Sequence, residues 1–165
     1  METKKIEENH NIKLLNEIYK NLKMGTQSID IVLNSIKDSA IMKELSDESA
    51  QYLVFEKEAL MLANSKDYNL KGNSCIQKTQ VWISVKLNLL SSSTTQHIAE
   101  MMLVGTMMGI IDLVKAMTNY DEADEEIKNF AEKVLDYERD RIDALFEFLK
   151  IKNNVDDETT KNEIK

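Results

Sequence analysis

"HIAEMMLVGTMMGIIDLVKAM" (residues 97–117) holds five of the nine methionines and two of the four glycines of this 165-residue chain. Such an apolar stretch is typical of a membrane span, of a helix that carries a metal site, or of a helix packed against others. Glu100, Asp112 and Lys115 fall within the roughly 20 residues that a bilayer crossing needs, and charged side chains are costly there. The stretch is therefore predicted to be a helix of a soluble bundle, with no membrane span.

The composition of the whole chain favours an all-α protein. Proline is absent and glycine occurs only four times, so few positions carry the residues that end helices. With 42% hydrophobic residues, a chain of this length can bury one sizeable core. We expect a single domain, residues 10–152, between a flexible N-terminus (residues 1–9) and a flexible C-terminal tail (residues 153–165).

Apolar residues at steps of three, four and seven predict the individual helices. They indicate one helix over about residues 10–37, a second up to about residue 65, the quoted stretch, and a last helix up to about residue 152. Residues 75–90 are also apolar, and form either a separate helix or part of a crossover along the bundle. The fold is therefore predicted to be an antiparallel four-helix bundle, or a five-helix bundle if residues 75–90 are independent.

Side chains that can cap helix N-termini mark where three of these helices begin. A Ser, Thr, Asp or Asn side chain accepts a hydrogen bond from the unpaired amides of the first turn. The second helix, the quoted helix and the last helix each have two such candidates, which are Asp38 or Ser39, Thr94 or Thr95, and Asn119 or Asp121.

The charge balance excludes one class of partner and suggests a compartment. The formal net charge is −8, and the only arginines, Arg139 and Arg141, lie among acidic residues. A protein that binds nucleic acid needs clustered basic residues, so we expect no nucleic-acid partner. The single cysteine, Cys75, cannot form an internal disulfide, and no signal peptide is visible, so a cytoplasmic location is expected.

Several segments together resemble a known family. They are residues 22–25, "KDSAIMKELSDESAQYLVFEKEAL" (residues 37–60), "WISVKLNLLSSS" (residues 82–93) and the helix around Gly105. Over residues 12 to 150 the chain resembles ferritin-like bundle domains of the YciE and YciF type. The resemblance implies a ferritin-like, self-associating antiparallel bundle in the cytoplasm, with a link to stress or iron.

The di-iron ligands of ferritin-like proteins are not apparent in this sequence. Such a site takes one glutamate from each of two helices and a Glu-x-x-His motif from each of two others. The motif occurs only at Glu7–His10, in the polar N-terminal segment, while Glu48 and Glu138 are followed three residues later by Gln51 and Arg141. The resemblance therefore holds with the ligand motifs lost.

Four residues remain weak metal candidates, each with a structural alternative. His97 and Glu100 lie one turn apart and could form half a metal site, but near a helix start we favour a solvent-facing His97 and a first-turn charge at Glu100. Glu56 and Glu138 border the inner faces of their helices. We favour ion pairs or hydrogen bonds there, with partners among Arg141, Tyr52 or Tyr137, over a residual metal or proton-transfer site.

Two functions follow from these observations. No phosphate loop, Ser-His-Asp set or Cys-x-x-Cys pair appears, so the sequence argues against an enzyme and predicts no cofactor. We favour a non-catalytic bundle that works through self-association, a dimer first of all, or through a protein partner. Its methionines would line a core or an interface; they are Met101, Met102, Met107 and Met108. The alternative binds iron or manganese at a carboxylate-rich site around Glu56, Glu100 and Glu138.

Gly105 and Gly109 form the most specific packing signal. Each glycine inside a helix costs roughly 1 kcal/mol relative to alanine, and close approach of a neighbour compensates for it. The sequence therefore predicts tight helix packing at Gly105 and Gly109, and loss of stability or assembly in Gly105→Leu or Gly109→Leu.

Overall fold

The structure is a computed structural model that describes residues 2–71 and 94–150, with side chains from residue 9 onward. It contains four helices, which are α1 (Glu2–Leu33), α2 (Ser39–Ser65), α4 (Thr95–Asn119) and α5 (Glu125–Leu149). No strand occurs among these residues, so the predicted all-α four-helix architecture is confirmed. Residues 75–90, Cys75 and the tail 153–165 lie outside the described part, and so do the predictions made for them.

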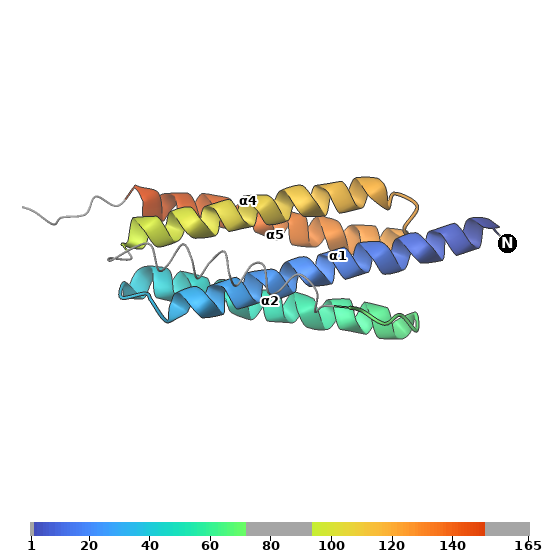
Figure 1. The fold of residues 1–165 in the computed structure, drawn as a ribbon, viewed down its shortest axis with the longest axis horizontal. Coiled ribbons are helices and arrows are strands. Elements are labelled where there is room, and N and C mark those ends of the chain that lie inside the picture. The colour runs from blue at the N-terminus through green and yellow to red at the C-terminus, as the bar shows by residue number, and fades with distance from the viewer. Residues whose placement is uncertain (1, 72–93, 151–165) are drawn as a thin grey trace, which may run out of the picture.

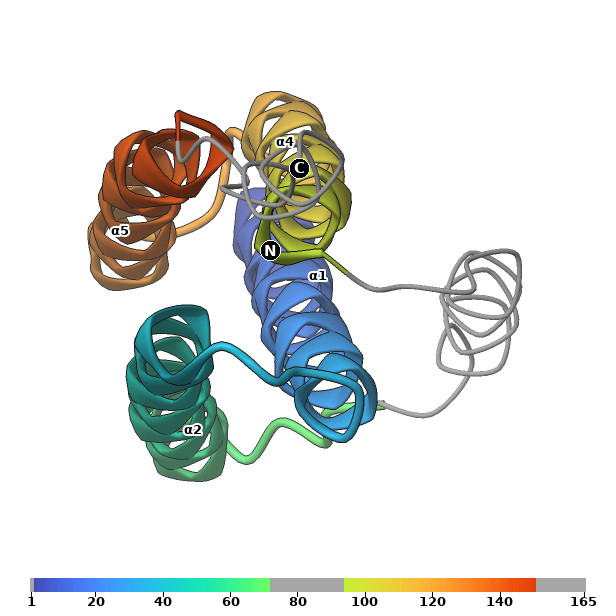
Figure 2. The same ribbon diagram turned by 90° about the vertical axis from the view of Figure 1, so that its left-hand side faces the viewer.

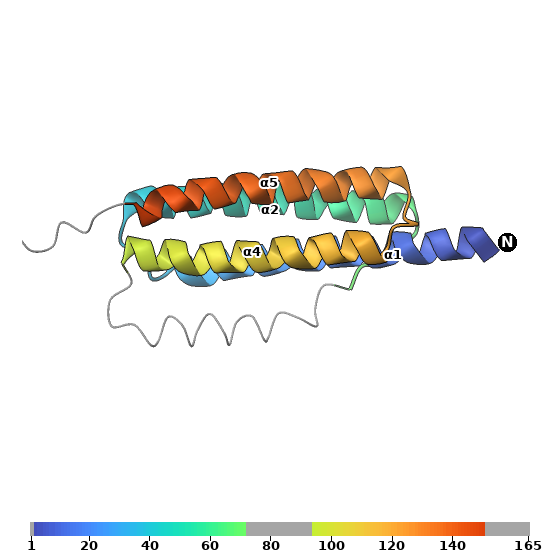
Figure 3. The ribbon, with the colours of Figure 1, turned by 90° about the horizontal axis from the view of Figure 1, so that it is seen from above.

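The four helices lie side by side along one long axis (Figure 1). Seen from the end, α1 lies between α2 and α4, and α5 lies beside α4, opposite α1 (Figure 2). The helix α1 runs antiparallel to both α2 and α4, while α2 and α4 run in the same direction (Figures 1 and 3). As a result, α2 ends at one end of the bundle and α4 begins at the other.

The helix boundaries differ from the prediction mainly at the ends of α1. This helix begins at Glu2 and so includes most of the segment assigned to a flexible N-terminus, and it ends at Leu33, four residues before the predicted end. No proline or glycine interrupts residues 2–9, so nothing local stops the helix there. The predicted starts at Asp38 and Thr94 are confirmed, since Asp38 accepts from the Ala40 amide and Thr94 from the His97 amide.

The predicted start of the last helix was wrong. Asn119 is the last residue of α4, Asp121 lies in the turn, and Asp124 caps α5 by accepting a hydrogen bond from the Ile127 amide at 3.1 Å. Asp124 is held in place from α1, because Asn11 Nδ2 donates to its other carboxylate oxygen at 3.1 Å and Asn11 Oδ1 accepts from its amide at 2.7 Å. Contacts distant in sequence therefore select the cap.

The core follows the apolar stripes of the four helices. The largest of the apolar side chains that are essentially inaccessible to solvent come from all four helices. They are Leu14, Leu15, Ile18, Leu22, Ile29, Ile41, Leu45, Ile98, Leu113, Ile127 and Leu145. Between α2 and α5 the core becomes aromatic, with Phe55 edge-on to both Phe130 and Tyr137. The polar cluster described below borders this aromatic layer.

Candidate functional site

Two buried glutamates meet between α2 and α5. Glu48 and Tyr52 lie one turn apart on α2, and Glu138 faces them from α5. The Tyr52 hydroxyl is 3.0 Å from Glu48 Oε1 and 3.0 Å from Glu138 Oε2. Glu48, Tyr52 and Glu138 are all at most 3% exposed, so the three polar groups depend on one another for hydrogen bonds. This set, with Arg141, is called the carboxylate cluster below.

The carboxylate cluster must hold at least one carboxyl proton. A tyrosine hydroxyl has a single hydrogen, so Tyr52 can donate to only one of the two glutamates. The second contact is a hydrogen bond only when that glutamate is protonated and donates to the phenol oxygen. Burial works in the same direction, since it raises the pKa of Glu48 to about 7 and that of Glu138 to about 8.

Arg141 decides which glutamate carries the charge. Its guanidinium pairs with Glu44, lies 3.7 Å from Glu48 Oε2 through Nε, and stacks over the Tyr137 ring. Glu138 has no ion pair with any described residue. A positive charge stabilises the ionised form of the closer carboxyl group, so Glu48 is the anion and Glu138 holds the proton.

The four metal candidates from the sequence are not brought together. Glu56 Oε1 accepts a hydrogen bond from the Thr26 hydroxyl at 2.6 Å, and its Oε2 lies 3.3 Å from Lys23 Nζ. Glu138 is hydrogen-bonded to Tyr52, one of its expected partners. The structural interpretation therefore fits both glutamates, although Glu56 finds its partners on α1.

His97 and Glu100 lie near the N-terminal end of α4. The distance from His97 Nδ1 to Glu100 Oε2 is 3.8 Å, and Glu100 is exposed. The expected first-turn charge at Glu100 was wrong, because α4 begins at Thr95 and its first turn holds no acidic residue. His97 is not solvent-facing, because its side chain is only 24% exposed and its Nε2 is buried without a hydrogen-bond partner in the described part of the chain. Over residues 2–71 and 94–150, no group of three or more His, Cys, Asp or Glu side chains is placed to hold a metal ion.

The glycines of α1 and α4 differ in what surrounds them. A Cβ on Gly25 would lie 2.6 Å from Tyr52 Cε2, so the Tyr52 ring packs directly against the backbone of α1. A Cβ on Gly109 would lie 2.9 Å from Asn21 Oδ1, while one on Gly105 would meet no described atom within 4 Å. The predicted close approach is thus present at Gly109, and Gly105 instead faces open space.

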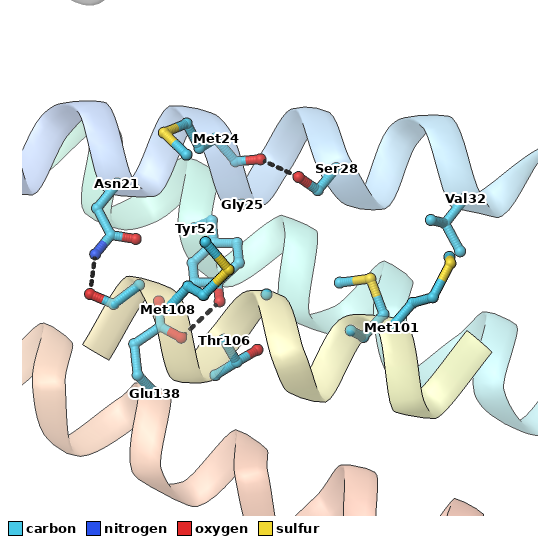
Figure 4. A pocket seen from close by; sticks show the side chains of 13 residues that line it. Asn21, Met24, Gly25, Ser28, Val32, Tyr52, Met101, Thr106, Met108 and Glu138 are labelled. Carbon is cyan, nitrogen blue, oxygen red and sulfur yellow. Dashed lines mark hydrogen bonds between the residues drawn. The ribbon is translucent and has the colours of Figure 1, made fainter. Parts of the chain in front are cut away.

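That open space is part of a cavity of about 300 Å³ between α1 and α4 (Figure 4). Gly25 and Gly105 lie on its two sides, and Tyr52 and Glu138 reach it from α2 and α5. Four methionine side chains also line it. They are Met24, Met101, Met102 and Met108. The cavity is therefore apolar along its walls and polar where it meets the carboxylate cluster.

A second apolar feature lies on the outer side of α4. Val104, Met107, Ile111 and Val114 are between 42% and 49% exposed, and their spacing of three and four residues places them along one stripe of the helix. This stripe is called the outer face of α4. By length and composition α4 would also qualify as a membrane span, with 39% of its most apolar window buried in the bundle.

The sequence did not predict that Tyr52 contacts both Glu48 and Gly25. Glu48 lies three residues after Leu45 and four before Tyr52, so its helical spacing already placed it on the buried stripe. Gly25 lies in the middle of a long helix, where glycine is unfavourable without a packing reason. Both signals were in the sequence, but neither identifies the partner on another helix.

Comparison with known proteins adds no relative. No protein-family model, no curated protein and no solved structure matches this chain. The ferritin-like resemblance accordingly stays a prediction.

Proposed function

We propose that this protein works by self-association, with the outer face of α4 pairing with the same face of a second copy. The observation that carries the proposal is the exposure of four large apolar side chains in one stripe, from Val104 to Val114. No charged residue occurs between residues 101 and 111, which suits the desolvated centre of an interface. Contiguous exposed apolar surface on a helix is typical of association sites.

The spacing of the stripe is self-complementary. The four positions are symmetric about residue 109, so an antiparallel pair with its two-fold axis at that level places Val104 opposite Val114 and Met107 opposite Ile111 of the second copy. A two-fold interface requires such a surface, which must match itself when turned around. Methionine adapts its shape to the partner, which favours close packing at Met107.

Sedimentation velocity of two lysine variants tests the proposal. We expect the wild-type chain to sediment as a dimer and the double variant Met107→Lys, Ile111→Lys to sediment as a monomer with an unchanged helical circular-dichroism spectrum. The matched control is Leu53→Lys, Met61→Lys, which places the same charges on exposed apolar positions of α2. A monomeric wild type at high concentration, or a dimer in which only the α2 variant interferes, would contradict the proposal.

A second candidate function is the binding of iron or manganese. It is favoured by the meeting of Glu48 and Glu138, two carboxylates that could exchange their shared proton for a cation. Elemental analysis of the purified chain provides the test. Stoichiometric iron or manganese, lost in Glu48→Gln, would support it, whereas a metal-free protein whose melting temperature does not respond to either ion would reject it.

A further inference from the structure

The cavity between α1 and α4 has room that the described side chains do not fill. Its volume of about 300 Å³ is twice that of the roughly 150 Å³ apolar cavity known to take up benzene, and lies at the lower end of ligand pockets. Gly25 and Gly105 contribute no side chain to it, and a Cβ at Gly105 would still contact nothing described. The space is therefore suited to a ring with a short chain.

The walls of the cavity are adaptable. Met24 comes from α1, and the other three methionines come from α4. A thioether side chain is unbranched and polarisable, so these walls can adjust to an apolar body and also contact an aromatic ring favourably. None of the four residues of the outer face of α4 lines this cavity, so binding in the cavity does not require pairing of the outer faces.

The inner end of the cavity is acidic. Glu138 lines the cavity with only 2% of its surface exposed, and its Oε1 accepts no hydrogen bond from the described side chains or amides. Behind it, the Arg141 guanidinium pairs with Glu44 and lies 3.7 Å from Glu48, while Glu138 has no ion pair with any described residue. A ligand group placed here would therefore be favoured if it donates hydrogen bonds and carries a positive charge.

We propose that this cavity binds a small primary amine with an aromatic or short aliphatic body, whose ammonium group donates a hydrogen bond to Glu138 Oε1. The apolar body lies among the methionines, and Gly105 provides the space for it. Binding a cation makes Glu138 ionise, so its carboxyl proton passes to the solvent and the ammonium group replaces it as a hydrogen-bond donor. Tyr52 then donates to one of the two glutamates.

Methyl NMR of methionine-labelled protein tests the proposal with 4-phenylbutylamine as the probe. We expect the methyl signals of Met24, Met101, Met102 and Met108 to shift, while those of Met42 and Met61, which lie on the exposed side of α2, stay in place. Two isosteric probes give the comparison. The alcohol 4-phenylbutanol should bind at least tenfold more weakly than the amine, and 4-phenylbutyrate should not bind.

Two variants separate the cavity from general surface binding. Gly105→Leu places a side chain in the open space and should abolish the shifts, with unchanged Met42 and Met61 signals reporting an intact fold. Glu138→Gln keeps the shape of the side chain and should lower affinity for the amine at least tenfold while leaving that for the alcohol unchanged. If Gly105→Leu does not fold, the loss of selectivity in Glu138→Gln decides alone.

Three results would overturn the proposal. The first is the absence of shifts at the four cavity methionines, as expected if another part of the chain or a second copy fills the cavity. The second is equal affinity for the amine and the carboxylate. The third is unchanged binding to a folded Gly105→Leu.

Discussion

The interior between α2 and α5 and the outer face of α4 invert the usual distribution of side chains. Glu48 and Glu138 are buried, whereas Met107 and Ile111 are exposed. Both arrangements are unfavourable unless something compensates, because buried carboxyl groups need hydrogen bonds and apolar surface gains by leaving water. The compensation for the glutamates lies inside the molecule, in Tyr52. For the outer face it has to come from outside, which is why we assign function to that face.

The largest expected effect contrasts two glycines across the cavity. Gly25→Leu should cost more than about 3 kcal/mol, because the new side chain would displace the Tyr52 ring that already lies within 2.6 Å of its Cβ position. The same substitution at Gly105 should leave the thermal midpoint equal or higher. Equal destabilisation of Gly25→Leu and Gly105→Leu in thermal melts would show that the two sites do not differ as described.

The pH dependence of stability isolates the buried glutamates. Their pKa values are raised in the folded state, to about 7 and about 8, from 4.5. The folded state therefore binds more protons, so the contribution is fully present below about pH 4.5 and is lost as pH rises through 7 and 8. We expect the unfolding free energy to fall by about 2–3 kcal/mol between pH 6 and pH 7. In urea melts, the unfolding free energy of Glu138→Gln should depend less on pH than that of the wild type. An identical pH dependence would argue against a buried proton.

Removal of one hydroxyl tests the hydrogen bonds of the carboxylate cluster. Tyr52→Phe leaves Glu48 and Glu138 without their shared partner and should cost about 1–3 kcal/mol. Tyr137→Phe is the matched control. Tyr137 is partly exposed, and no hydrogen bond to its hydroxyl is seen in the described part of the chain, so this change should be nearly neutral. Chemical denaturation measures both, and similar losses would mean that Tyr52 acts only through packing.

The smallest expected effects are at the glycines of α4. Gly105→Ala should stabilise the chain by up to about 1 kcal/mol, since alanine favours the helix and its Cβ meets open space. Gly109→Ala should change stability by less than about 1 kcal/mol, because only the amide end of Asn21 has to move. Differential scanning calorimetry can resolve the two effects. A marked loss of stability in Gly105→Ala would support the tight packing predicted from the sequence.

These contrasts show what sequence patterns can and cannot establish here. The caps Asp38 and Thr94 were predictable because the accepting side chain and the donating amide are two or three residues apart. Asp124 was not, because its selection depends on Asn11, more than a hundred residues away. Likewise, spacing placed Gly25 and Gly105 inside helices but could not show that only Gly25 faces an aromatic ring.

The carboxylate cluster was predicted in part for the same reason. Helical periodicity placed Glu138 at the border of its helix's inner face, and Tyr52 was one of three expected partners. The role of Glu48 did not, since its distance from Arg141 depends on how α2 and α5 are aligned along their axes. Helical faces are encoded locally, whereas the level at which two helices meet is a property of the whole bundle.

Cross-linking of two single-cysteine variants tests the pairing of the outer faces most directly. In a Cys75→Ser background, Val104→Cys and Val114→Cys are oxidised separately and as an equal mixture. Antiparallel pairing predicts that the mixture forms a disulfide-linked dimer between the two different variants, while either variant alone forms little. Efficient cross-linking of each variant with itself, or no cross-linking above that of Leu53→Cys on α2, would contradict the account.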